Sequence, residues 1–396
     1  MRKVWALFLL AGLAAPYVAG AQDLPVTKSA GPSENLQACV MVGVGFWAVP
    51  GTDTCIKLSG EMRADYVVTQ PHSRDDDTTS FQSRAQVGFD ARTLTDYGLL
   101  RSYLLLDGYV EPGGKSSFLV DKAYIQFGGV TAGYAHSFFG IYDLDYANDI
   151  YQPYFGYAGT TDLLAYTHQF DHGISATLSF EDARATRSSL FSETNPTGAV
   201  PAAGTVMPDI VGNVRIDQNW GEAAVFGALH QIRYPGPVVA GSDYGFALGG
   251  GLGLNLPILS GAHIAAEGTY ASGASTYLGW QQLDAAFDNN TRLTDTGNGW
   301  TATGELGVNL TYRLTLNLLG SYLNYSGADA NNFLDPPTSN IKAWSAGGNV
   351  VYTLTRGFSV GAEVFYSSFT ERSDFAFDPK LTSKGWTGAL RLRRSF

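Results

Sequence analysis

The sequence predicts an all-β fold, a transmembrane antiparallel up-and-down β-barrel of about sixteen strands, an even number as in single-chain bacterial barrels. Three observations predict it. Segments in which apolar and polar residues alternate one by one recur from residue 55 to the last residue, the connections between them include very short and long ones, and an export signal precedes them. Because alternation puts successive side chains on opposite sides of a strand, one face suits lipid and the other suits water.

The chain begins with an export signal, which we assign to residues 1–21. Arg2 and Lys3 supply its positive start, a short apolar run follows, and Ala19-Gly20-Ala21 has the small-x-small pattern that precedes cleavage. A helix needs roughly 20 apolar residues to span a bilayer, and neither this run nor any later stretch supplies them. We therefore expect the mature chain to leave the cytoplasm, and we exclude a helical membrane protein.

Residues 22–54 are predicted to form a loop-rich lead-in, because prolines and glycines interrupt them repeatedly. Residues 55–396 are predicted to form the barrel. Its first strand shows the period of two, since Ile56, Leu58 and Met62 alternate with lysine, serine, glutamate and arginine. The same alternation recurs to the last residue, and helical periodicity does not compete with it in these windows.

The connections between strands are of two kinds, as expected of a barrel with short periplasmic turns and long outer loops. The tight connections are Thr95–Gly98, Asp171–Gly173, Asn219–Gly221, Tyr312–Arg313 and Thr355–Gly357. The long polar ones lie near residues 69–79, 140–160, 183–206, 272–298, 326–340 and 368–384.

Aromatic residues mark the membrane boundary and the end of the barrel. Trp300, Trp344 and Trp386 each open a strand that follows a long loop, which places them at one membrane interface, where amphipathic rings are enriched. The last residue, Phe396, shares the apolar face of the final strand with Trp386. A terminal aromatic on the lipid side resembles the signal by which outer-membrane barrels are recognised for insertion.

Composition excludes several classes of protein. Only 15% of the residues are charged, against about 25% in soluble proteins. The formal charge of −11 becomes −13 when Arg2 and Lys3 leave with the signal, so nucleic acid is not an expected partner. A secreted β-sandwich is the soluble alternative, but it rarely needs so many strands of ten or more residues.

No catalytic site, metal site or cofactor is expected. The six histidines lack metal-ligand spacing, and no Gly-x-Ser-x-Gly motif is present. An outer-membrane protease or lipase stays conceivable only because such sites can be assembled from scattered loop residues.

The inward positions carry the function, because a closed barrel with a polar inner face is filled with water. Arg63, Arg84 and Arg391 lie on strands expected to be neighbours across the closure, and we predict that they form a basic pore wall. For each arginine alone, a solvated lumen residue without a particular role is the alternative. The predicted function is passive diffusion of small hydrophilic solutes and ions through the outer membrane of a Gram-negative bacterium.

The segment 140–161 is predicted to be the third outer loop and to fold into the lumen. It is rich in tyrosine, carries Asp143, Asp145 and Asp149, and contains no basic residue. These carboxylates would face the arginines across a narrowed zone, and the resulting transverse field would favour polar solutes. Together with the net charge, they predict weak cation selectivity. An ordinary outer loop is the alternative.

The chain has two cysteines, Cys39 and Cys55. In the oxidising periplasm they can form a disulfide worth about 3 kcal/mol by the chain-entropy model, or they can stay as free thiols.

The segment that follows Cys39 resembles the opening of the general porins of alphaproteobacteria. The similarity is most specific at residues 45–60, which read Gly-Phe-Trp-Ala-Val-Pro-Gly-Thr-Asp-Thr-Cys-Ile-Lys-Leu-Ser-Gly. It continues at Leu100–Tyr103, at Ala123–Gly129 and in the last strand. The resemblance implies a sixteen-stranded porin, a homotrimer surrounded by outer-membrane lipids, with its third outer loop inside each pore. It also implies that the two cysteines pair.

Two further functions are consistent with the same fold. A substrate-specific channel for a sugar or another nutrient would line its path with aromatic side chains, and Tyr103, Tyr124 and Phe365 are the inward aromatics expected here. A non-conducting adhesin or structural barrel would carry no current. Flux that saturates at low solute concentration would identify the first, and silence in a bilayer would identify the second.

Overall fold

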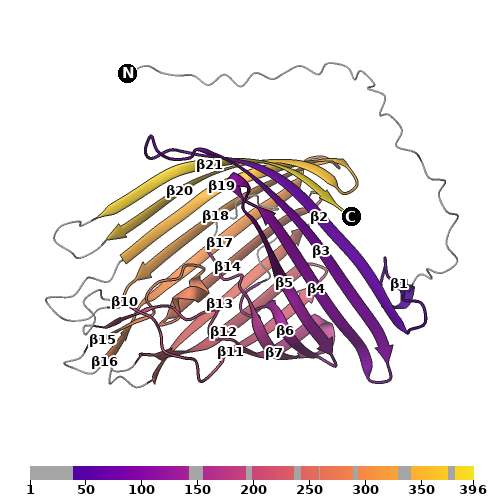
Figure 1. The fold of residues 1–396 in the computed structure, drawn as a ribbon, viewed down its shortest axis with the longest axis horizontal. Helices are drawn as coiled ribbons and strands as arrows, with labels where there is room; N and C mark the ends of the chain where they lie inside the picture. Colours follow the sequence, from indigo (N-terminus) through magenta and orange to yellow (C-terminus); the bar gives the residue numbers. More distant parts are fainter. Residues whose placement is uncertain are drawn as a thin grey trace, which may run out of the picture.

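In the computed structural model the chain forms one large antiparallel β-sheet that closes on itself (Figure 1). The structure describes residues 39–141, 155–192, 199–235, 242–257, 259–288, 293–328, 340–372 and 380–396. The predicted signal 1–21 and residues 22–38 of the predicted lead-in 22–54 lie outside these ranges. No helix of the described residues is long and apolar enough to cross a membrane.

The described residues contain a sheet of seventeen strands, of which β1 (Trp47–Ala48) is a short stub and the other sixteen build the barrel. The predicted fold class is thus confirmed. In chain order the barrel strands are β2 (Thr54–Thr69), β3 (Thr79–Thr95), β4 (Gly98–Val110), β5 (Ser116–Phe127), β6 (Val130–His136), β7 (Thr160–Gln169), β8 (Ile174–Glu181), β11 (Asp209–Gln218), β12 (Gly221–Arg233), β13 (Ser242–Leu256), β14 (Ala262–Ser272), β17 (Asn298–Asn309), β18 (Leu314–Ser326), β19 (Asn340–Thr355), β20 (Phe358–Arg372) and β21 (Leu381–Ser395).

The barrel closes where its first strand pairs with its last. β2 and β21 are antiparallel neighbours, with Tyr66 opposite Leu390 (Figure 1). At the end of this seam where the chain terminates, Gly60 and Phe396 exchange both backbone N–H···O bonds, each 3.0 Å long. A Cβ at position 60 would stand 2.3 Å from the Phe396 ring, so glycine makes room for the terminal aromatic. Closure leaves no strand edge unpaired in the hydrocarbon, where an open edge could not be satisfied.

The connections agree with the predicted two kinds. All five predicted tight turns join consecutive strands at one end of the barrel, which we take as periplasmic. The third outer loop, residues 137–159, follows the fifth barrel strand as predicted. One outer connection differs, since residues 111–115 form a short turn where the pattern of long outer loops predicts a longer one. Pro112 and two glycines with positive φ, Gly113 and Gly114, allow this turn to reverse in few residues.

The predicted tryptophans lie in one continuous aromatic row on the outer face. The register places Tyr270 opposite Trp300, Tyr322 opposite Trp344 and Tyr366 opposite Trp386. Diagonal ring contacts between Trp300 and Tyr322 and between Trp344 and Tyr366 join these pairs into one row over six consecutive strands. Trp300 stacks on Tyr322 with ring centroids 5.0 Å apart. Such a belt is typical of a membrane–water interface.

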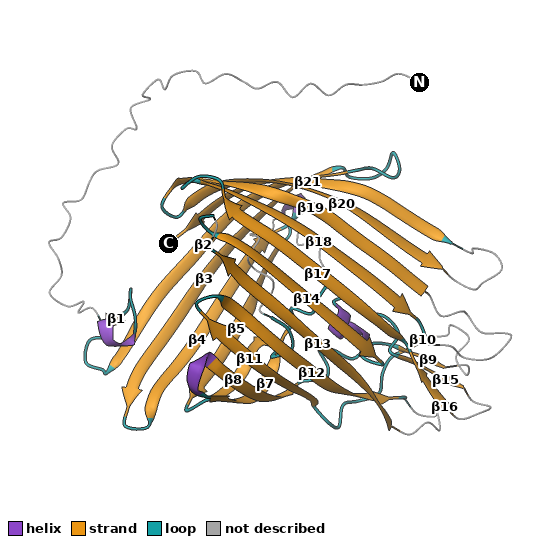
Figure 2. Ribbon diagram, turned by 180° about the vertical axis from the view of Figure 1, so that it is seen from behind, coloured by secondary structure: helices purple, strands orange, loops and turns teal. Residues whose placement is uncertain are grey.

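The fourth and sixth outer loops, residues 182–208 and 273–297, carry a small second sheet. It contains β9 (Leu190–Ser192), β10 (Ala199–Val200), β15 (Ala285–Asp288) and β16 (Leu293–Thr296). Figure 2 shows these strands gathered at the outer end of the barrel. The sixth loop also contains the short helix η5 (Ser275–Leu278), whose Tyr277 is fully buried.

The interior of the barrel is filled on one side. Phe139 of the third loop packs edge-on against Phe226 of β12, with centroids 4.7 Å apart, and lies 4.6 Å from the ring of Tyr277. This apolar cluster covers the inner wall at β11–β14, β18 and β19. The remaining lumen therefore lies toward β2–β5 and β21.

Candidate functional site: a lumen with charged walls

The predicted basic residues all lie on the inward face. In β2 the exposed Ile56, Leu58 and Met62 are outward, and the alternate positions, including Arg63, are inward. By the same alternation Arg84 of β3 and Arg391 of β21 are inward.

The arginines come together across the seam. Arg63 lies directly opposite Arg84 on one side and opposite Arg393 on the other. Like charges directly opposite one another on neighbouring strands repel. Carboxylates close to these arginines are therefore needed to offset the repulsion between the guanidinium groups.

Each predicted arginine has such a carboxylate. The Nε of Arg63 lies 2.9 Å from Glu61, and the Nε of Arg391 lies 2.7 Å from Asp65. Arg84 donates through Nε to Asp107 at 3.0 Å. These partners were not predicted, although Glu61 and Asp65 stand two residues from Arg63 on the same face of β2.

A second basic cluster lies nearer the periplasmic end. Asp90 accepts hydrogen bonds from Arg92 at 2.9 Å and from Arg101 at 3.0 Å, so one carboxylate serves two guanidinium groups. Arg101 also donates to Gln126 at 3.0 Å. Arg92 donates to the backbone oxygen of Val42 at 2.7 Å. The cluster therefore joins three barrel strands to the segment before β2.

That segment is a small lobe, residues 39–53, closed by the disulfide that the resemblance implied. Cys39 and Cys55 are bonded with an S–S distance of 2.07 Å. The lobe packs Phe46 beneath the Arg92 guanidinium, 4.5 Å from the ring centroid. Its strand β1 pairs with β2 at Cys55 and Ile56, beyond the point where β21 ends. The lobe thus pairs with the part of the β2 edge that extends past the end of β21, at the periplasmic mouth of the barrel.

The described ends of the third outer loop lie inside the barrel, as predicted. The backbone N–H groups of Phe138 and Ile141 donate to the carboxylates of Glu181 at 3.0 Å and Glu267 at 2.7 Å. On the returning end, Phe155 donates from its N–H to Ser321 at 2.7 Å. The predicted constriction residues Asp143, Asp145 and Asp149 lie outside the described residues.

The wall beneath this loop is acidic, which the sequence analysis missed. Six carboxylates on this wall are at most 9% exposed, and they are Glu181, Asp209, Glu222, Glu267, Glu305 and Glu363. The inward basic residues of β2–β5 and β21, by contrast, keep partial contact with the lumen, as shown by the 20% and 24% exposed side chains of Arg84 and Arg101. The alternation within each strand predicts that these six carboxylates point inward, but it does not predict that a loop covers them.

One of these carboxylates, Asp209, belongs to a buried network at the outer end. His230 of β12 lies between Asp209, 2.8 Å from its Nδ1, and Asp284 of the sixth loop, 3.8 Å from its Nε2. Asp209 also accepts from the hydroxyl of Tyr277 at 2.8 Å. Asp284 accepts from the backbone N–H of Ser188 at 2.9 Å. The network therefore ties the fourth and sixth loops to the barrel wall.

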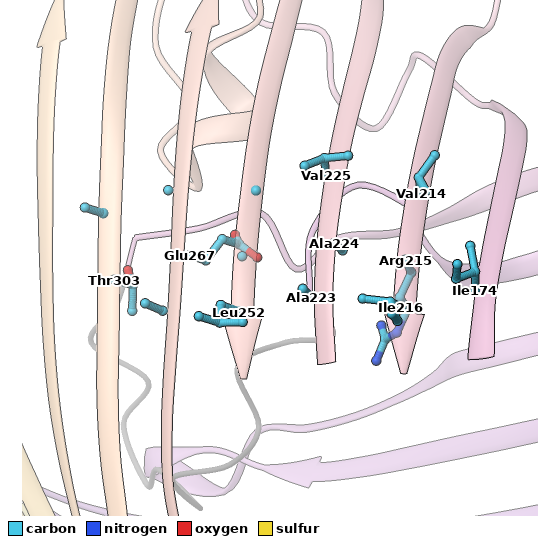
Figure 3. A pocket seen from close by; sticks show the side chains of 15 residues that line it. Ile174, Val214, Arg215, Ile216, Ala223, Ala224, Val225, Leu252, Glu267 and Thr303 are labelled. Atoms are coloured by element: carbon cyan, nitrogen blue, oxygen red, sulfur yellow. The ribbon is translucent and has the colours of Figure 1, made fainter. Parts of the chain in front are cut away.

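The described residues hold no group of three or more side chains arranged to bind a metal ion. A depression of about 830 Å³ crosses β8, β11–β14 and β17, where Ile174, Val214, Val225 and Leu252 supply an apolar lining (Figure 3). These four side chains belong to the outward set, so this depression is not part of the solute path. The polar chemistry lies in the lumen.

Comparison with known proteins agrees with this architecture. The model of the family described as "Porin subfamily" matches residues 23–388. Porin Omp2b of Brucella suis is 24% identical over 413 residues, which cover 98% of this chain and 99% of the relative.

Solved structures share the fold. The outer-membrane channel DcaP of Acinetobacter baumannii aligns with a TM-score of 0.70 at 15% identity, over 87% of this chain and 98% of that one. The trimer form of OmpT from Vibrio cholerae aligns with a TM-score of 0.50 at 12% identity, over 87% and 100% of the two chains. The family and the names of its relatives are those of channels rather than enzymes. The chain belongs to the porin subfamily, and it is an outer-membrane β-barrel of a Gram-negative bacterium that serves passive diffusion.

Proposed function

We propose that the channel sorts small hydrophilic solutes and ions by a transverse field and that it is weakly cation-selective. The observation that carries the proposal is the separation of charge among the described inward residues. Basic side chains outnumber carboxylates on β2–β5 and β21, and carboxylates dominate on β8, β11–β14, β17 and β20. A field across a narrow, water-filled lumen orders polar solutes and slows apolar ones.

The cation preference depends on the third outer loop. The basic wall remains partly exposed and the opposing wall carboxylates are buried, so Asp143, Asp145 and Asp149 are the acidic groups proposed to reach the permeating ions. Rings of acidic side chains favour cations.

Replacing Asp143, Asp145 and Asp149 by asparagine is therefore expected to shift selectivity from cations toward anions. The measurement is the reversal potential of the purified protein in a planar bilayer under a salt gradient. A matched control replaces Asp75, Asp76 and Asp77 of the exposed first outer loop by asparagine, which changes the net charge equally and should shift the potential little. An unchanged reversal potential in the first variant would remove these carboxylates from the mechanism, and a wild-type protein that carries no current would contradict the channel itself.

We further propose that the channel is a homotrimer. Supporting this, the OmpT structure of the same fold is titled a trimer form. The chain extracted in mild detergent is expected to have three times the protein mass of the heat-dissociated chain, measured by light scattering with refractive-index correction for detergent. A protein mass equal to that of one chain would contradict this.

A further inference from the structure

A cavity of about 360 Å³ lies beside the third outer loop, within the lumen that remains open. One side of it is formed by inward residues of β4, β5 and β6, and the other by residues 137–140 and 157–159 of the loop. Its volume falls in the range of roughly 300–1,000 Å³ that small-molecule sites occupy.

Three cationic side chains line this cavity, and none of the described residues that line it is Asp or Glu. The cations are Arg101, Lys122 and Arg215. Arg101 is fixed by Asp90, which it shares with Arg92, so this part of the wall keeps an excess of positive charge. The ammonium of Lys122 is 4.0 Å from Asp121, at the limit of an ion pair, and its side chain is 21% exposed. Lys122 is therefore available to an anion that enters.

The same cavity has aromatic walls. The rings of Tyr103 and Tyr124 lie 5.3 Å apart, and the Arg101 guanidinium lies 5.0 and 5.6 Å from their centroids. Phe138 and Tyr157 of the loop line the opposite side. Ring faces next to a cation suit a solute that has both a planar apolar body and an anionic group.

We propose that this cavity is a subsite for small aromatic carboxylates on their way through the pore. The carboxylate would lie against the Lys122 ammonium and the Arg101 guanidinium, and the ring against Tyr103, Tyr124 and Phe138. The proposal rests on the proposed diffusion function, because solutes reach the cavity only through the open lumen. It extends that function by adding a binding step for one class of solute, in a channel that passes other small solutes without one.

The test is single-channel recording with benzoate, and with benzamide as its uncharged analogue of the same shape. Benzoate is expected to produce brief, concentration-dependent blockages that saturate, and benzamide is expected to produce none. Acetate, which has the charge without the ring, should block for shorter times than benzoate.

Variants assign the blockages to this cavity. Lys122→Gln should shorten the benzoate residence time roughly two- to fivefold, the range expected from a partly exposed ion pair, and Lys122→Arg should restore it. Lys57→Gln is the matched control, because Lys57 is an inward lysine of β2 that does not line the cavity. Open current without benzoate blockages, or blockages equally shortened by Lys57→Gln, would overturn the subsite and leave diffusion intact, whereas the absence of any current would overturn the proposed diffusion itself.

Discussion

Replacing Glu181 and Glu267 together by alanine is expected to release the third outer loop from the barrel wall and to raise the single-channel conductance. The two carboxylates accept the backbone N–H groups of Phe138 and Ile141 in the interior. A buried donor left without its acceptor costs about 1–3 kcal/mol, so two such losses favour an arrangement in which the loop leaves the wall. Because the loop fills one side of the lumen, its departure widens the path.

Two control variants distinguish the loss of the hydrogen bonds that hold the loop from the loss of negative charge in the barrel wall. Glu181→Gln with Glu267→Gln keeps an acceptor oxygen at both sites and should keep the wild-type conductance. Glu363→Ala removes another buried inward glutamate, which accepts a hydrogen bond from the Asn349 side chain of the neighbouring strand, and should change conductance little. A double alanine variant that folds and conducts like the wild type would show that the two hydrogen bonds do not hold the loop.

The barrel itself was predictable because its signal is local. Alternation within each strand, breakers between strands and the even spacing of turns are all read within a few residues, and β2 begins at Thr54, one residue from the predicted start. The inward direction of Arg63, Arg84 and Arg391 follows from the same alternation. These features depend on the chain's own geometry and on no distant partner.

The partners of those arginines could not be predicted, because pairing depends on register. Arg84 meets Asp107 across two strands whose alignment is fixed by the turn at 96–97, and a shift by one residue would have sent the carboxylate to the lipid face. The carboxylates that bind the third outer loop are even harder to predict from the sequence. Glu267 accepts from Ile141 across 126 residues of sequence, and no local pattern distinguishes it from any other inward glutamate.

Replacing His230 by leucine is expected to destabilise the folded protein by about 3–5 kcal/mol, the usual cost of breaking a buried charge pair by removing one partner. His230 is the basic group that the structure places between Asp209 and Asp284, and both carboxylates are buried. Leucine fills a similar volume but offers neither a donor nor a positive charge, so the two buried carboxylates would lose the basic group between them. The fourth and sixth outer loops should then loosen from the wall. Urea midpoints of the protein in detergent, followed by tryptophan fluorescence, measure the loss, and trypsin cleavage after Arg184 and Arg187 reports the loosening.

The size of this loss should depend on pH. Burial raises the pKa of Asp284 above its usual value, so in the folded protein its neutral form is favoured relative to the unfolded chain. A carboxyl with a raised folded pKa stabilises the fold at low pH and loses that contribution as the pH rises through the folded pKa. The destabilisation by His230→Leu should therefore be larger at neutral pH and smaller in acid.

Removing the remaining charge tests this explanation directly. Asp284→Asn in the His230→Leu background should recover part of the lost stability and flatten its pH dependence, because the amide carries no charge to bury. His168→Leu is the matched control, since His168 is an exposed histidine near a periplasmic turn, and its loss should cost little. If the urea midpoint of His230→Leu fell equally at neutral and acidic pH, or if Asp284→Asn restored nothing, the loops would be held by packing around Tyr277 and not by the balance of charge at His230.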